Sequence, residues 1–205
     1  MGVFIIFISI DTCIDQYKES RKANIDDADI PSGIRSIVDF IFSQSLINND
    51  ISNLLGISIE CNRLDLLDKA LRSSSSIRSS LYSVLHLIQE FNYSEDVKTK
   101  VLTLLQPLFV EEGDRFGVFL CLLYLHNQAD CTCFSILSLV IKLLIQCSQE
   151  DVESAYQMAF FLYELADVKF CYSITHAFPQ EELQNKNSPL FKMQQILLGT
   201  VSTDL

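Results

Sequence analysis

Apolar side chains recur along much of this chain at the spacing of one helix face. The clearest stripe lies within residues 77–91 and consists of Ile77, Leu81, Val84, Leu85 and Ile88. Intervals of three and four residues place such side chains on the same side of an α-helix. We find no stretch of polar and apolar alternation bounded by turn residues, which would indicate a strand. The pattern therefore predicts an all-α fold.

Polar segments between the stripes predict where the helices begin and end. Helices are expected over about residues 3–22, 32–48, 51–59, 64–71, 77–91, 94–109, 116–125, 133–145 and 152–163. Three positions offer side-chain oxygens that can cap the next helix: Ser32, the serine run 73–76, and Ser148 followed by Asp151. The helix that contains Pro107 is expected to tolerate this residue or to kink there.

Short polar segments join these helices in pairs. Residues 60–63 and 126–130 are expected to be the tight turns of two helix hairpins. Hairpins beginning near residues 51, 77, 116 and 152 are spaced by roughly 25 to 40 residues, which is typical of stacked helix pairs. The sequence therefore predicts an α-solenoid-like array of antiparallel helix hairpins. We assign residues 1–178 to a rod of stacked hairpins, 179–189 to a linker and 190–205 to the start of a further helix.

Composition and charge limit the classes of partner. Of the 205 residues 49% are hydrophobic and 20% are charged, which fits amphipathic helices with additional apolar surface for neighbouring proteins. The net charge of -11 argues against nucleic acid, because binding phosphates requires clustered Lys and Arg. The densest basic group, Lys18, Arg21 and Lys22, stands beside several acidic residues and is expected to be a solvated helix end.

A membrane partner is not expected either. A spanning helix needs about 20 apolar residues, whereas Val118–Leu125 is short and the run 134–145 is interrupted by polar side chains. The apolar start, residues 3–8, lacks the positive n-region and the cleavage site of a signal peptide. The seven cysteines lie mostly in apolar stretches, where a reduced thiol acts as a small hydrophobic group, and this suits a reducing compartment.

Candidate chemistry is sparse along the chain. The residues that most resemble a set of metal ligands are Cys131, Cys133 and His126. Zinc sites, however, use wider spacing and four ligands. A thiol nucleophile and base could in principle come from Cys13 or Cys171 with His86 or His176, although no third group positions them. The carboxylate pairs at 111–112, 150–151 and 181–182 are expected near helix starts, where the helix dipole favours negative charge. We therefore predict no enzyme, no catalytic, cofactor or metal residues, and no small-molecule substrate.

Several segments, taken in their order along the chain, resemble those of one family. They are Gly56–Asp65, which resembles a helix-turn-helix, and residues 13–17, 28–31, 100–102, 121–122, 155–164, 191–193 and 196–197. The family that they resemble is the N-terminal rod of proteasome regulatory particle non-ATPase subunit 1. Each segment alone is a helix-packing pattern, so the specificity lies in the series. The resemblance covers nearly the whole chain.

The resemblance implies a non-catalytic scaffold in the base of the regulatory particle. Such a protein supports ubiquitin-dependent degradation by holding ATPases, ubiquitin receptors and lid subunits, and it is cytoplasmic and nuclear. Members of the family continue into a toroid of glycine-rich repeats. This chain has six glycines and stops at Leu205, so we expect the toroid to be missing and the chain to be a fragment, a truncated gene model or a separately encoded part. The alternatives are a free-standing helical-repeat adaptor for protein-protein interaction and a small thiol-dependent enzyme.

Overall fold

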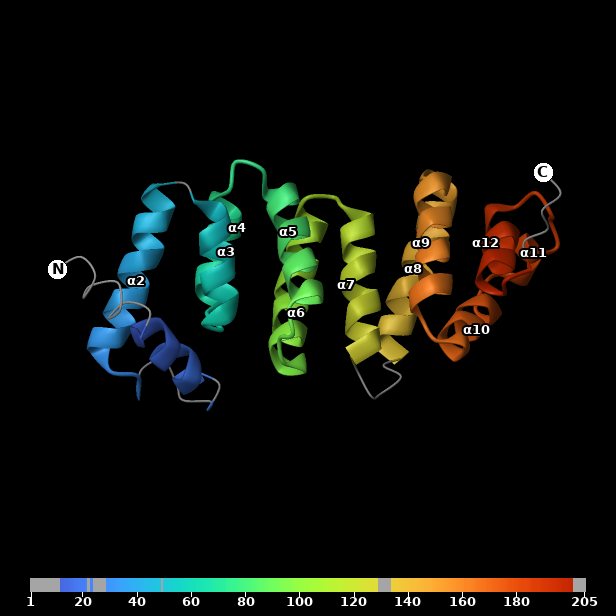
Figure 1. The fold of residues 1–205 in the computed structure, drawn as a ribbon. Helices are drawn as coiled ribbons and strands as arrows, with labels where there is room; N and C mark the ends of the chain where they lie inside the picture. The colour runs from blue at the N-terminus through green and yellow to red at the C-terminus, as the bar shows by residue number, and fades with distance from the viewer. Residues whose placement is uncertain (1–11, 22, 24–28, 49, 129–133, 201–205) are drawn as a thin grey trace. The chain divides into compact units, whose positions relative to one another are not determined.

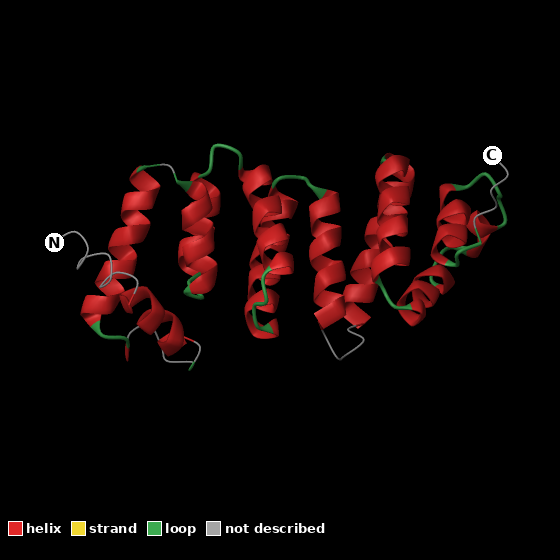
Figure 2. Cartoon of the chain, in the orientation of Figure 1, coloured by secondary structure: helices red, strands yellow, loops and turns green. Residues whose placement is uncertain are grey.

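The computed structural model describes residues 12–21, 23, 29–48, 50–128 and 134–200. Every regular element in this part of the chain is a helix, and no strand occurs in it (Figure 2). Residues 12–21 are helical. The helices that follow are α2 (Ser32–Ile47), α3 (Ile51–Glu60), α4 (Leu64–Ser73), α5 (Ile77–Glu90), α6 (Glu95–Glu111), α7 (Arg115–Gln128), α8 (Phe134–Glu150), α9 (Val152–Leu165), α10 (Val168–His176), α11 (Gln180–Leu183) and α12 (Pro189–Leu197). The predicted all-α, solenoid-like fold class is confirmed.

The chain divides into two compact units, Met1–Leu104 and Leu105–Leu205. The division falls within α6, which continues through Pro107. In the first unit, α3 packs on α2, α4 and α5, so each helix lies against its neighbours in sequence (Figure 1). In the second unit, α8 packs on α7 and α9, and α12 lies against α9. In α5, four side chains of the stripe read from the sequence are buried: Leu81, Val84, Leu85 and Ile88.

The turn between α3 and α4 lies where the sequence predicts it. The amide of Asn62 donates to the carbonyl of Ile59 (3.0 Å), and that of Arg63 donates to Ser58 (2.8 Å). This pair of hydrogen bonds is a Schellman motif, which places one residue in the left-handed region after the helix end. Asn62 takes that position with φ 50°. Asparagine tolerates this conformation better than most side chains, so a local signal fixes the hairpin.

Three capping predictions are wrong. The residue at the start of α2 is Pro31, and no side chain caps that helix; Ser32 is already helical. Ser76 stands at the start of α5 without a side-chain cap hydrogen bond. Ser148 lies inside α8, where its hydroxyl donates to the carbonyl of Ile145 (2.7 Å). Asp151 caps α9 instead by accepting from the amide of Ser154 (3.2 Å).

Several boundaries also differ from the prediction. His126 belongs to α7, which continues to Gln128, so it is not a turn residue. A separate helix, α10, follows α9 because Asp167 accepts from the amide of Phe170 (2.9 Å) and begins it. Glu111 ends α6 rather than preceding a helix, and Glu112 follows it. The predicted linker 179–189 includes the short helix α11, and its role as a linker stays a prediction. Residues 3–11, 129–133 and 201–205, on which other predictions fall, lie outside the described residues.

Candidate functional site

Within the described residues, the candidate thiol Cys171 and the candidate bases His86 and His176 each contact another part of the chain. The thiol of Cys171 is buried and lies 3.5 Å from the carbonyl oxygen of Leu162. His176 is exposed and contacts Tyr172 with ring centroids 4.2 Å apart. His86 lies one turn from Glu90, with 3.5 Å between Nδ1 and the carboxylate. These three groups therefore contact different partners, and Cys13, the other candidate thiol, lies half-buried in the helical residues 12–21.

Burial makes the structural thiols poor nucleophiles. It raises the pKa of Cys61 to about 11 and that of Cys121 to about 12. An activated thiol shows the opposite shift, because catalysis uses the thiolate. Both thiols lie in the hydrophobic interior and contribute packing there.

His126 is a structural residue of the second unit. It is 7% exposed, and its ring stacks on Phe170 with centroids 3.7 Å apart. Its Nε2 lies 3.2 Å from the carboxylate of Asp167, the residue that begins α10. Within the described residues no three potential ligands gather around a metal position. Cys131 and Cys133, the other members of the candidate metal group, lie outside those residues.

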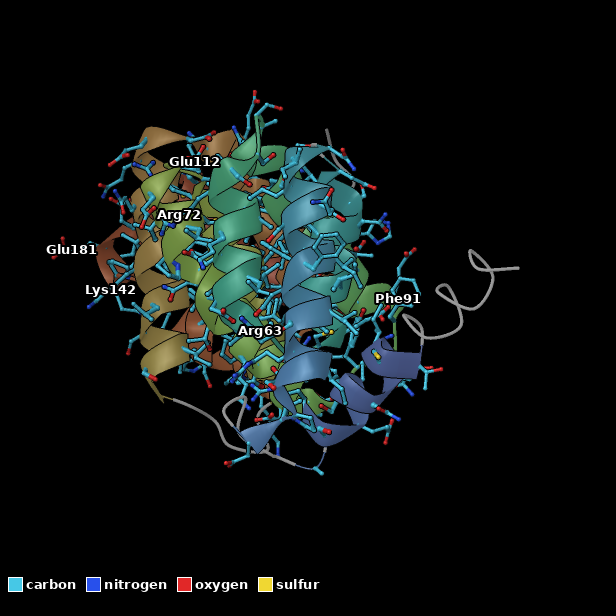
Figure 3. The ribbon with its side chains drawn as sticks, turned by 90° about the vertical axis from the view of Figure 1, so that its left-hand side faces the viewer. Arg63, Arg72, Phe91, Glu112, Lys142 and Glu181 are labelled. Atoms are coloured by element: carbon cyan, nitrogen blue, oxygen red, sulfur yellow. The ribbon has the colours of Figure 1, made fainter. Side chains whose placement is uncertain are left out.

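Polar contacts in the first unit concentrate on Arg63, the first residue after the α3–α4 turn. Its side chain is 11% exposed. Nε and Nη2 donate to the two carboxylate oxygens of Asp65 at 2.8 and 2.7 Å. Nη1 donates to Asp39 of α2 and to the hydroxyl of Tyr17, each at 3.2 Å. The two-pronged contact holds the pKa of Asp65 below its usual value. Arg63, labelled in Figure 3, thus joins α4, α2 and the helical residues 12–21.

The basic residues near the N-terminus also contact this turn. Lys18 forms an ion pair with Glu60, and its side chain is only 25% exposed. Nη2 of Arg21 donates to the backbone carbonyl of Asn62 (3.3 Å). The prediction of a solvated helix end is therefore wrong for both residues. The partners lie some forty positions away along the chain, and sequence spacing could not indicate them.

A recess of about 790 Å³ opens beside this turn. Its walls come from residues 12–21, the end of α3 and the connection from α5 to α6. Phe91, labelled in Figure 3, lies on this recess with 54% of its surface exposed. Burial and the nearby Glu60 raise the pKa of Tyr93, so its hydroxyl stays protonated and can donate a hydrogen bond.

Both apolar and polar side chains line this recess. Its described lining combines Ile59, Phe91 and Tyr93 with asparagines and charged groups that have partners inside the unit, and it contains neither cysteine nor histidine. An aromatic side chain beside polar groups is typical of a protein-binding surface. The sequence offered one signal that our prediction passed over, a phenylalanine placed in a polar connection. No described helix combines the length and the hydrophobicity that a membrane span requires.

The described residues define an all-helical protein built of packed helix hairpins. The chain belongs to the family described as 26S proteasome subunit RPN2, N-terminal domain, whose model matches residues 4–205. The family that the sequence resembles is thereby confirmed.

Individual relatives agree with this assignment. The chain is 28% identical over 171 residues to the 26S proteasome non-ATPase regulatory subunit 1 of Dictyostelium discoideum, covering 82% of this chain and 17% of the relative. It is 27% identical over 187 residues to the 26S proteasome regulatory subunit rpn2 of Schizosaccharomyces pombe, covering 88% and 18%. It therefore spans less than one fifth of the length of these relatives.

Proposed function

We propose that this chain is a non-catalytic scaffold subunit in the base of the proteasome regulatory particle. In this role it supports ubiquitin-dependent protein degradation by holding other subunits in place. The observation that carries the proposal is the family match over residues 4–205, on a fold built of helix hairpins. The relatives' names, which call them non-ATPase regulatory subunits, are consistent with it.

The mechanism is binding through helix surfaces. Apolar side chains such as Ile47 and Phe91 remain exposed on helices and connections whose other faces form the core. Docking of such side chains in a partner removes apolar surface from water, which is the main driving force of association. The buried, high-pKa thiols and the separated imidazoles favour this mechanism over catalysis.

The partners that we propose are the other subunits of the regulatory particle: its ATPases, ubiquitin receptors and lid subunits. Nucleic acid, membranes and small-molecule substrates are not among them. The proposed location is the cytoplasm and the nucleus.

Affinity purification followed by quantitative mass spectrometry tests the proposal. A tagged chain, expressed at its natural level, is expected to recover proteasomal ATPases well above an untagged control. Recovery of other proteins without any proteasome subunit would contradict the scaffold role and would support a free-standing helical-repeat adaptor. An Ile47→Ala and Phe91→Ala double variant shows whether exposed apolar side chains contribute, because both side chains are more than half exposed and lie outside the core.

A further inference from the structure

Helix α9 has one buried and one exposed face. Its buried face consists of Ala155, Met158, Ala159 and Leu162, and it packs on α8 and α12. The opposite face contains two large aromatic residues, Phe160 and Tyr163, which are 49% and 54% exposed. Residues three apart on a helix are neighbours, so the two rings form one patch.

The end of α12 extends this patch. A Cβ atom at Gly199 would lie 3.2 Å from the ring of Tyr163, so the backbone there touches the tyrosine. The preceding residue, Leu198, is 42% exposed. Phe160, Tyr163 and Leu198 are here called the α9 aromatic face. Large exposed apolar residues gathered in this way are typical of a protein interaction site.

Acidic side chains flank the aromatic face along the same helix. Four exposed residues follow one another at intervals of four, three and four positions: Glu153, Gln157, Phe160 and Glu164. The two carboxylates stand about 16 Å apart along the axis, one beyond each end of the aromatic pair. Helix α9 itself contains no lysine or arginine.

The surroundings of α9 are also acidic. Residues 105–205 contain twelve acidic and five basic side chains. Of the basic ones, Arg115 forms an ion pair with Glu150. Lys142, Lys169 and Lys192 lie on helices that pack against α9. Even with these lysines, acidic side chains outnumber basic ones by twelve to five in residues 105–205, and this excess favours a cationic partner.

We propose that the α9 aromatic face docks a basic amphipathic helix of a partner protein. Apolar side chains of that helix cover Phe160, Tyr163 and Leu198, and its Lys or Arg side chains, spaced by about three turns, face Glu153 and Glu164. Arginine is especially suited because its guanidinium also packs on the faces of phenylalanine and tyrosine. The inference rests on the proposed scaffold function, since it gives the chemistry of one partner surface.

Charge also argues against a second copy of this chain as the occupant. Pairing two α9 aromatic faces would bring the carboxylates of Glu153 and Glu164 near their counterparts in an already acidic surface. Like charges at an interface disfavour association. A cationic helix has the opposite electrostatic effect.

Binding of a designed peptide to the purified full chain tests the inference. The probe is a fluorescein-labelled helical peptide of 18 residues with a leucine stripe flanked by arginines, followed by fluorescence anisotropy. A control peptide has glutamates in place of the arginines and is expected not to bind. Phe160→Ala is expected to weaken binding of the arginine peptide about tenfold, as at an interface hot spot. The matched control Phe40→Ala alters a similarly exposed phenylalanine on α2 and is expected to change the affinity by less than about twofold.

A second pair of variants distinguishes attraction of the peptide by the two carboxylates on α9 from attraction by the net charge of the chain. Glu153→Gln with Glu164→Gln is expected to weaken binding and to reduce its dependence on salt concentration. Glu111→Gln with Glu112→Gln removes the same charge elsewhere and is expected to have little effect. Equal effects of the two double variants, or of Phe160→Ala and Phe40→Ala, would overturn the inference. Thermal melts by circular dichroism verify that each variant is folded.

Two further outcomes are distinguishable. A concentration-dependent dimer in light scattering that Phe160→Ala abolishes would make a second copy the occupant and would overturn the inference. Loss of proteasome subunits from the affinity purification, with peptide binding intact, would contradict the scaffold function alone. Retained proteasome subunits without peptide binding would overturn the docking inference alone.

Discussion

The ring of Phe109 occupies the space that a side chain at Gly117 would need. A Cβ atom built on Gly117 would lie 2.1 Å from Cδ1 of Phe109, well inside van der Waals contact. Phe109 is fully buried near the end of α6, and Gly117 lies in the first turn of α7. The amide of Gly117 also donates to the carboxylate of Asp114 (2.9 Å). The start of α7 is thus fixed against α6 by a contact that only glycine permits.

Gly117→Ala is therefore expected to destabilise the chain. The added methyl group must displace a buried phenylalanine, and overpacking of this kind costs about 1–3 kcal/mol. Chemical denaturation followed by circular dichroism measures the change. Gly56→Ala is the matched control, because nothing lies within 4 Å of its Cβ position in α3. It is expected to stabilise the helix by about 0.5–1 kcal/mol, and equal losses in both variants would contradict the packing argument.

Arg63→Lys is expected to lower the free energy of unfolding by about 1–2 kcal/mol. A lysine cannot make the two-pronged contact with Asp65 while also reaching Asp39 and Tyr17. The control Arg72→Lys changes an exposed arginine that pairs with Asp68 one turn away, and it is expected to cost less than about 0.5 kcal/mol. Urea titrations of both variants give the comparison. A negligible effect of Arg63→Lys would show that the α3–α4 turn does not depend on this residue.

The contact with Asp65 also predicts a dependence of stability on pH. Arg63 lowers the pKa of the folded-state carboxyl. The ion pair between Arg63 and Asp65 therefore contributes its full stabilisation of the folded state above the unfolded-state pKa of about 3.9. This stabilisation is lost as pH falls through the lower pKa of the folded state. Asp65→Asn is expected to be less stable than the parent chain near neutral pH, with a difference that shrinks in acid. A difference that stays constant from neutral to acid pH would count against this linkage.

The buried thiols are expected to resist alkylation in the folded chain. Cys61 and Cys121 are fully buried, and burial raises the pKa of each, to about 11 and about 12. Iodoacetamide at about pH 8 should modify the half-buried Cys13 faster than either of them, as peptide mass spectrometry can show. Unfolding in denaturant should remove the difference. Rapid modification of Cys61 in the native chain would contradict the burial that the structure gives this thiol.

Local signals in the sequence were sufficient for helices α2 to α9 and for one turn. The stripe at residues 77–91 became α5, and Asn62 ended α3 because a short polar side chain at that position permits the left-handed conformation. Caps were less predictable, because a serine hydroxyl can donate to its own helix as readily as it caps the next, as Ser148 does. The start of α10 had a signal, Asp167 before an apolar stripe, which our prediction did not use.

The candidate binding surfaces could not be predicted in the same way. The recess beside Phe91 combines three segments, and Arg63 reaches Tyr17 across 46 positions of sequence. The close approach of Phe109 and Gly117 depends on how two helices meet rather than on any motif. The family resemblance, by contrast, was readable because it lies in the order of many helix-packing segments.

Sedimentation of native extract through a density gradient tests the central proposal most directly. The fractions are assayed for the chain by antibody and for the proteasome by peptidase activity. A scaffold subunit of the regulatory particle is predicted to sediment together with the peptidase activity of the assembled proteasome. A chain found only in the slowly sedimenting fractions of free, unassembled protein would contradict the proposal.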